Sequence, residues 1–155
     1  NLKPENLGYY TVYLPAYSDE FILKKLSKHP DQKFQVFSKH TREDYSQENV
    51  EVYKVNNEKF NLSLAKSEGL LTGGGFEGPA EALFLGKKLL CVPMFHQYEQ
   101  QCNALAAEKM GATVIWSEKE FDQKLNHWLK NAEPIQVHFP DETEEVIKNL
   151  IEKYS

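Results

Sequence analysis

The sequence predicts one α/β domain whose sheet is parallel and covered by helices on both faces. Short apolar runs rich in β-branched and aromatic residues alternate along the chain with longer segments of helical period. These helical segments are about 10–13 residues long, which is the length that connects parallel strands. A chain of 155 residues suits one domain. Right-handed crossovers then give a doubly wound, Rossmann-like, three-layer α/β/α arrangement.

The first half of the chain supplies three strands and two helices. The predicted strands are residues 9–14, 33–38 and 50–55. Ser18 is expected to cap the first helix, because an acidic first turn follows it, and this helix reaches about His29. Asn57 is expected to cap the second helix, whose apolar positions run to Ala65.

The second half supplies three further strands and four helices. The predicted strands are residues 69–72, 89–93 and 112–116. The predicted helices are residues 79–85, 98–110, 117–130 and 142–154. Pro79 fits a first helical turn, where its missing N–H is not needed, and Gly86 and Gly111 follow two of the helices.

Composition and charge exclude several classes of protein. The net charge of −5 and the absence of any Lys/Arg run longer than two argue against a nucleic-acid partner. We expect Cys91 and Cys102 to be buried and reduced, with a disulfide between them the less favoured alternative, which suits a cytoplasmic location. No apolar run approaches the roughly 20 residues that span a bilayer. The sequence begins with Asn1 and without Met, so we expect a fragment of a longer protein.

Glycines gather in one part of the chain. Six of the eight lie between Gly69 and Gly86, and three are consecutive after the strand at 69–72. Glycine lets the backbone approach a ligand closely, and the start of the next helix favours a phosphate. A flexible turn between strand and helix is the alternative. The segment lacks the Gly-Lys-Ser/Thr of a P-loop and follows a late strand, unlike the G-x-G-x-x-G loop of dinucleotide enzymes.

A longer pattern of about 40 residues contains this glycine segment. It comprises residues 72–83, Gly86-Lys87-Lys88, Val92-Pro93 and residues 99–104. The pattern resembles the donor-binding segment of UDP-sugar glycosyltransferases, both the C-terminal domain of glycosyltransferase family 28 and the UDP-glycosyltransferases. The resemblance implies the C-terminal half of a two-domain GT-B enzyme that moves a hexosyl group from a nucleotide sugar, with UDP as the expected nucleotide.

The resemblance also implies roles for ten residues. The diphosphate would be held by Gly73, Gly74, Gly75 and Phe76, the ribose by Glu81, the base by Val55 and Asn56, and the sugar by His96, Glu99 and Gln100. A carboxylate such as Glu81 can accept two hydroxyl donors at once, although a solvated helix glutamate looks the same in sequence. His96 has the alternative of a plain surface histidine, and Gln97 or Gln101 is an alternative to the expected sugar contacts.

Some features depart from the family pattern. Glu77-Gly78 stands where the plant-type enzymes have Asn-Ser, so we expect Glu77 to point away from the diphosphate or to select a different donor. No Asp-x-Asp occurs, and neither a metal nor a cofactor is implied. The general base and the acceptor site are expected on an N-terminal domain that is absent here, so the catalytic residues stay unknown.

The partners follow from the same resemblance. They are a nucleotide sugar, the missing N-terminal domain and an unidentified acceptor. In the family a C-terminal helix crosses back onto the N-terminal domain, which is one role for residues 142–154; capping this domain is the other. A peripheral membrane association of the full-length protein stays open. The alternatives to a transferase fragment are a stand-alone donor-binding subunit of a heteromeric transferase and a nucleotide-sugar epimerase domain.

Overall fold

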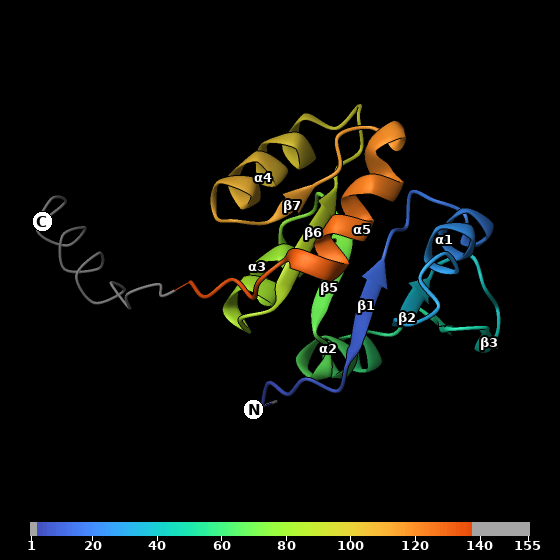
Figure 1. Ribbon diagram of the computed structural model, residues 1–155. Coiled ribbons are helices and arrows are strands. Elements are labelled where there is room, and N and C mark those ends of the chain that lie inside the picture. Colours follow the sequence, from blue (N-terminus) through green and yellow to red (C-terminus); the bar gives the residue numbers. More distant parts are fainter. Residues whose placement is uncertain (1–2, 138–155) are drawn as a thin grey trace, which may run out of the picture.

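The computed structural model describes residues 3–137, which build one seven-stranded sheet with helices on both faces (Figure 1). The strands are β1 (Tyr9–Tyr13), β2 (Lys33–Ser38), β3 (Tyr45–Gln47), β4 (Val50–Lys54), β5 (Gly69–Gly73), β6 (Lys88–Val92) and β7 (Thr113–Val114). The helices are α1 (Asp19–Leu26), α2 (Asn57–Lys66), α3 (Glu77–Phe84), α4 (Tyr98–Lys109), the short 3-10 helix η1 (Glu118–Glu120) and α5 (Phe121–Asn131). The helix expected at 142–154 lies outside the described residues.

The strand order is β3-β4-β2-β1-β5-β6-β7, and every neighbouring pair except β3 with β4 is parallel. Without β3, the parallel strands follow the order of a doubly wound Rossmann-like sheet. The predicted fold class is therefore confirmed. The order reverses between β1 and β5, and in such sheets ligands bind beyond the carboxyl ends of the strands at this point.

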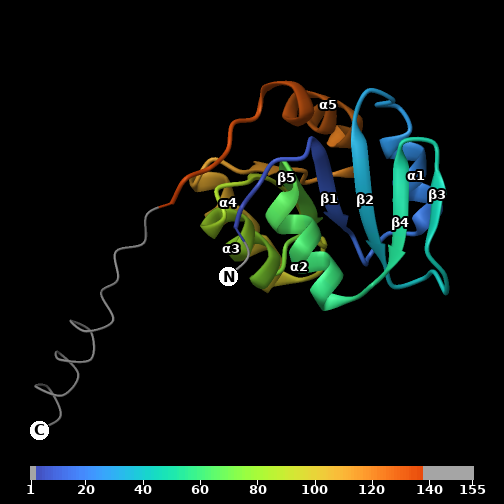
Figure 2. The ribbon, with the colours of Figure 1, turned by 90° about the horizontal axis from the view of Figure 1, so that it is seen from below.

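Two apolar cores lie on opposite faces of the sheet. Helices α1 and α5 pack on one face, where Trp128 is fully buried beside Tyr10, with ring centroids 5.0 Å apart. Helices α2, α3 and α4 cover the other face, and their core includes Leu64, Ala82 and Ala104. Figure 2 shows the sheet between these two helical layers.

The structure corrects several local predictions. The cap of α2 is Asn56 and not Asn57, because the side chain of Asn56 accepts a hydrogen bond from the Lys59 amide (2.9 Å). The strand expected at 112–116 is only β7, and the helix expected at 117–130 is divided into η1 and α5. Ser117 makes no side-chain cap bond to the turn that follows it.

One cysteine also differs from the prediction. Cys91 is buried in β6, as expected, whereas Cys102 is exposed, and both thiols are free. Helix α4 buries Ala104 and Ala107 against the sheet. Cys102 lies two residues before Ala104, about 200° around the helix axis, and therefore faces away from the core.

Side-chain hydrogen bonds cover the outer edge of β7 and the residues that follow it. The Lys124 ammonium group donates to the Val114 carbonyl (2.7 Å), and a Glu120 carboxylate oxygen accepts from the Trp116 amide (3.2 Å). Lys124 and Glu120 also form an ion pair (3.2 Å). These groups satisfy backbone donors and acceptors that an edge strand would otherwise offer to another chain.

A buried lysine ties together the amino ends of the strands, at the sheet edge opposite their carboxyl ends. The Lys87 ammonium group donates to the carbonyl oxygens of Glu5 (2.6 Å), Ala65 (2.9 Å) and Ser67 (2.7 Å). Desolvation by burial lowers its pKa. Lys87 belongs to the Gly-Lys-Lys part of the family pattern, so this part of the pattern has a structural role.

Candidate functional site

The loops after β1, β5 and β6 leave the sheet side by side. Tyr13 of β1 pairs with Thr72 of β5, and Gly73 pairs with Val92 of β6. These pairs bring the loop after β1, the glycine segment and the loop before α4 to one edge. The edge is at the point where the strand order reverses.

The glycine segment is seated directly on the start of α4. A Cβ atom at Gly74 would lie 2.6 Å from the Gln100 carbonyl oxygen and 3.0 Å from the Pro93 Cβ. The Asn103 side-chain amide donates to the Gly74 carbonyl (3.3 Å). Gly74 is therefore needed for close packing. Asn103, part of the family pattern without an assigned role, holds the loop in place.

The neighbouring glycines have open space in front of them. A Cβ atom at Gly75 would meet nothing within 4 Å, and one at Gly73 would meet nothing nearer than 3.9 Å. Helix α3 then begins at Glu77 with Phe76 in the cap position and no side-chain cap bond. An open loop followed by an uncapped helix start offers amide donors and the positive end of the helix dipole to an anion.

The acidic residues of α3 lie on its exposed face. Pro79, Ala82 and Leu83 are buried, whereas Glu77 and Glu81 are exposed. Glu81 stands one turn beyond Glu77, since residues four apart share a helix face. The carboxylate of Glu81 is therefore open to a ligand lying across the start of α3.

The loop before α4 is held by its own glutamines. The Gln100 side-chain oxygen accepts from the Met94 amide (3.0 Å), and its nitrogen donates to the Gln97 side chain (2.6 Å). The Gln101 side-chain nitrogen donates to the Phe95 carbonyl. Both polar atoms of Gln100 thus maintain the loop, and its predicted contact with a sugar would require these bonds to open. Gln97 and Gln101, the alternatives, are also bonded inside the loop.

The other two expected sugar contacts, His96 and Glu99, have exposed side chains. The His96 ring stands edge-on to the Phe95 ring, with centroids 5.6 Å apart. Phe95 itself is 77% exposed. His96 and Glu99 are therefore open to a ligand at this loop.

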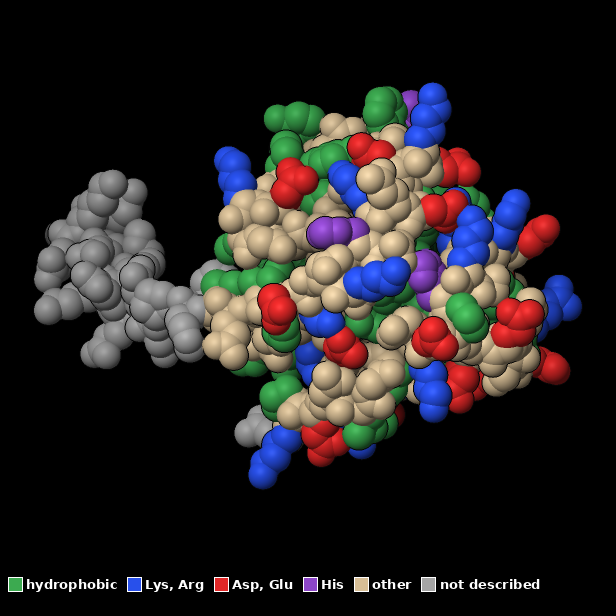
Figure 3. Space-filling model, in the orientation of Figure 1, with side chains coloured by type: hydrophobic (Ala, Val, Ile, Leu, Met, Phe, Trp, Pro, Cys, Tyr) green, Lys and Arg blue, Asp and Glu red, His purple; other side chains and the backbone are tan. Residues whose placement is uncertain are grey.

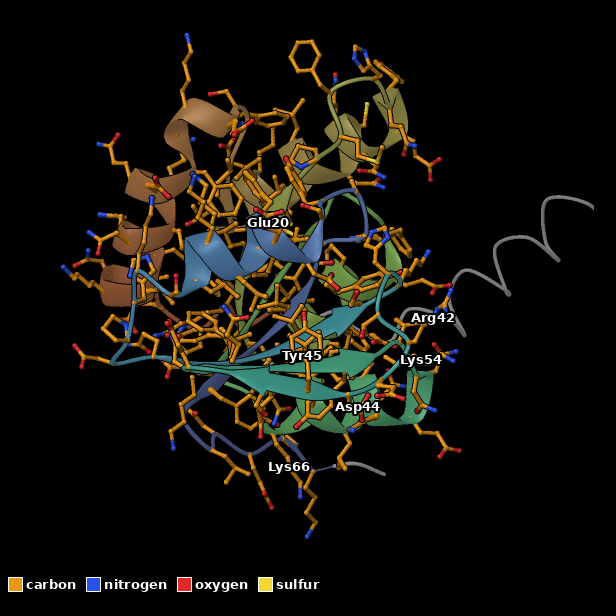
Figure 4. All side chains as sticks on the ribbon, turned by 90° about the vertical axis from the view of Figure 1, so that its right-hand side faces the viewer. Glu20, Arg42, Asp44, Tyr45, Lys54 and Lys66 are labelled. Atoms are coloured by element: carbon orange, nitrogen blue, oxygen red, sulfur yellow. The ribbon has the colours of Figure 1, made fainter. Side chains whose placement is uncertain are left out.

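The residues expected at the base lie farther along the same edge. Val55 and Asn56 follow β4, and two strands, β2 and β1, separate β4 from β5. The Val55 amide donates to the Ser38 carbonyl (3.0 Å), which ties the end of β4 to that of β2. Figure 4 shows Arg42 and Lys54 at this end of the sheet. The Asn56 side-chain oxygen caps α2, so its amide nitrogen is the polar side-chain atom left for a ligand.

Two hollows on the surface involve residues that the sequence did not single out. A cavity of about 290 Å³ lies at the ends of β6 and β7, and its walls include Tyr17, Trp116 and Glu118. A larger hollow of about 500 Å³ lies beside the outer edge of β7, and one strand, β6, separates β7 from β5 and its glycine segment.

The rest of the described surface has mixed chemistry. The face in Figure 3 intersperses acidic and basic side chains. Within residues 3–137, no three His, Cys, Asp or Glu side chains are placed to hold a metal ion. No helix in that part of the chain is both long and apolar enough to cross a bilayer.

The sheet order and the glycine segment beside its reversal point define a doubly wound, Rossmann-like domain. A family model described as glycosyl transferase family 1 matches residues 1–133. The chain belongs to this family. None of the curated proteins compared with it is significantly similar.

Solved structures share the fold at low sequence identity. The glycotransferase of kitacinnamycin matches with a TM-score of 0.62 at 17% identity, over 83% of this chain and 36% of that chain. The glycosyltransferase SnogD from Streptomyces nogalater matches with a TM-score of 0.55 at 14% identity, over 96% and 45%. ALG13 matches with a TM-score of 0.57 at 12% identity, over 96% and 98%. The chain thus spans less than half of the two antibiotic-type enzymes but nearly all of ALG13.

Proposed function

We propose that this chain binds a nucleotide-diphosphate sugar, with UDP as the expected nucleotide, as the donor half of a glycosyltransferase that moves a hexosyl group. The glycine segment carries the proposal. Gly74 is locked against α4, Gly75 faces open space, and α3 starts without a cap. This arrangement can receive the diphosphate and stabilise the charge that develops on it as the sugar departs.

The remaining contacts follow the sheet edge. Gly73 and Phe76 flank the diphosphate, and Glu81 accepts hydrogen bonds from the ribose hydroxyls. The base extends toward Val55 and Asn56 at the end of β4. His96 and Glu99 are the exposed groups on the sugar side, whereas Gln100 shapes the loop that carries them.

The acceptor and the catalytic base belong to a second half in this proposal. Family membership supports a transferase, and the chain spans 36% and 45% of the two antibiotic-type enzymes. We expect the 155 residues alone to bind donor weakly and to transfer nothing, without a metal or other cofactor. Turnover by the isolated chain would contradict this part of the proposal.

A stand-alone donor-binding subunit is the second candidate. The match to ALG13 covers 98% of that chain, so a solved chain of about this length has this fold without a second domain. In that case the acceptor half is a separate polypeptide. Co-purification of the chain with a partner of GT-B N-terminal type would favour this candidate, and a continuous reading frame containing both halves would exclude it.

A nucleotide titration tests the donor binding that both hypotheses, the transferase fragment and the stand-alone subunit, require. The chain is titrated with UDP, ADP, GDP and TDP while its backbone amides are followed by heteronuclear NMR. We expect millimolar or tighter binding of one nucleotide, with shifts at Gly73 to Gly75, near Glu81 and near Val55. A folded sample that responds to no nucleotide, or responds only elsewhere, would contradict a donor site at this edge.

A further inference from the structure

The cavity at the ends of β6 and β7 has the chemistry of a carbohydrate site. Its walls include the aromatic side chains of Tyr17, Phe95 and Trp116, and its polar groups come from Ser117 and Glu118. A pyranose ring presents apolar C–H faces and a rim of hydroxyl groups. Aromatic walls match the faces, while a hydroxyl and a carboxylate match the rim.

Two of the three aromatic walls, Tyr17 and Trp116, are held in place by neighbouring residues. The Tyr17 ring stacks on Phe21, with centroids 4.8 Å apart and planes 20° apart, and meets Phe121 edge-on. The Trp116 indole N–H donates to Glu108 (3.3 Å), while its backbone amide donates to Glu120 (3.2 Å). Because these contacts already hold both rings, a ligand has little ordering of them to do on binding.

The polar groups remain available to a ligand. The Ser117 hydroxyl makes no cap bond to η1. Tyr17 and Glu118 both line the cavity. Burial, and then the nearby charge of Glu118, raise the pKa of the Tyr17 phenol. A neutral phenol and a carboxylate together supply one donor and several acceptors to sugar hydroxyls.

The cavity also lies within reach of the proposed diphosphate site. Val92, on its wall, is paired with Gly73 at the end of β5. Ligand pockets usually measure about 300–1,000 Å³. The volume of about 290 Å³ is at the lower end of this range and suits one ring rather than a larger group.

We propose that this cavity binds one hexopyranosyl ring, with Tyr17 and Trp116 against its faces and Ser117 and Glu118 on its hydroxyls. The inference rests on the proposed function for the placement of the diphosphate. It adds a sugar contact that includes neither Glu99 nor Gln100. The ring belongs to the donor sugar or to the acceptor, and both present the same chemistry.

The test compares UDP with UDP-glucose, UDP-galactose and UDP-N-acetylglucosamine, using the 155-residue chain and NMR. We expect one nucleotide sugar to bind about three- to tenfold more tightly than UDP, the gain of one or two added hydrogen bonds. Sugar-dependent shifts should appear at Tyr17, the Trp116 indole, Ser117 and Glu118. Glu118→Gln and Tyr17→Phe should lose the gain while binding UDP unchanged, whereas the remote control Glu133→Gln should keep it.

Methyl hexopyranosides form the second arm and identify the source of the ring. Competition with the nucleotide sugar assigns the cavity to the donor, and binding to the chain already saturated with nucleotide sugar assigns it to an acceptor. Equal affinities for UDP and every nucleotide sugar, with no response of the cavity to a methyl hexoside, would overturn the proposal while leaving the nucleotide site intact. If no nucleotide binds, the proposed function fails, and the response of the cavity to methyl hexosides alone decides this inference.

Discussion

Gly74 lies so close to Gln100 that a Cβ atom on Gly74 would stand 2.6 Å from the Gln100 carbonyl oxygen. Substituting Gly74 with Ala must therefore push α4 away from the loop. We expect Gly74→Ala to lower the free energy of unfolding by about 1–3 kcal/mol, as overpacking does elsewhere. Urea denaturation of the purified variant measures this. An unchanged midpoint would show that the loop does not depend on this contact.

Gly75 provides the matched substitution, because a Cβ atom there would meet nothing within 4 Å. Gly75→Ala should leave stability unchanged or raise it by a few tenths of a kcal/mol, since alanine restricts the unfolded chain. It should weaken nucleotide binding by about tenfold, because the methyl group occupies the space that the diphosphate needs. Calorimetric titration with the nucleotide checks this, and unaltered affinity would place the diphosphate elsewhere.

Asn56 and Asn57 form a second matched pair. Asn56→Ala removes the side chain that accepts from the Lys59 amide, and we expect a loss of about 1 kcal/mol of stability. Asn57→Ala, at the first position of α2, should change stability by less than about 0.5 kcal/mol. Thermal unfolding of both variants gives the comparison. Equal effects would mean that the cap contributes little.

Most of the sheet could be predicted from sequence because its parallel strands are buried on both faces. Such strands appear as short apolar runs, and residues 69–72 and 89–93 match β5 and β6 closely. Strand β3 carries no such pattern, since all three of its residues are exposed at the sheet edge. The cap of α2 was misplaced by one residue because two adjacent asparagines offer the same chemistry. Asn56 is the one with the extended backbone of a cap residue (φ −151°, ψ 126°).

Some features of the candidate site could also be predicted from the sequence, and others could not. The glycine segment was predictable because close packing and open space both require glycine there. The structural role of Gln100 could not be predicted, since a side-chain amide that closes a loop and one that contacts a ligand look the same in sequence. The cavity was missed because Tyr17 and Trp116 lie 99 positions apart and meet only through the order of the strands.

The two cysteines should react very differently. Cys91 is buried, and burial raises the pKa of its thiol to about 12, whereas Cys102 is exposed on α4. Iodoacetamide should therefore modify only Cys102 in the native chain, because the thiolate is the reactive form. Mass spectrometry before and after unfolding counts the modified thiols. Cys102→Ser should abolish native labelling, and labelling of Cys91 without denaturant would contradict the buried β6.

Asp122 links α5 to α1 through Lys25 (3.1 Å) and to the turn after α1 through Lys28 (2.7 Å). The hydrogen bond from Lys28, followed by that from Lys25, lowers the pKa of Asp122 below its ordinary value of 3.8. Its contribution to stability is therefore complete above this value and is lost as the pH falls through the lower, folded-state pKa.

The contribution of Asp122 is small because the carboxylate is largely exposed and screened, about 0.5 kcal/mol. Asp122→Asn should lower the unfolding midpoint slightly at pH 7, and the difference from the parent chain should shrink steadily at pH values below 3.8. Urea titrations at several pH values measure it. A difference that grows as the pH falls would contradict the assigned direction.

Glu120 serves two neighbours at once. The bond from Lys124 is the main cause of its lowered pKa, and its carboxylate also holds the amide of Trp116, whose side chain forms a wall of the cavity. The same carboxylate therefore holds Lys124, whose ammonium group covers the Val114 carbonyl of β7, and anchors the loop around the cavity. A substitution of Glu120 that reshapes this loop would also free Lys124 and so expose the edge of β7 to pairing with strands of other molecules. Under the proposed sugar site, a change in sugar preference made through Glu120 would therefore also promote aggregation, whereas a change at Tyr17 would not involve the edge of β7.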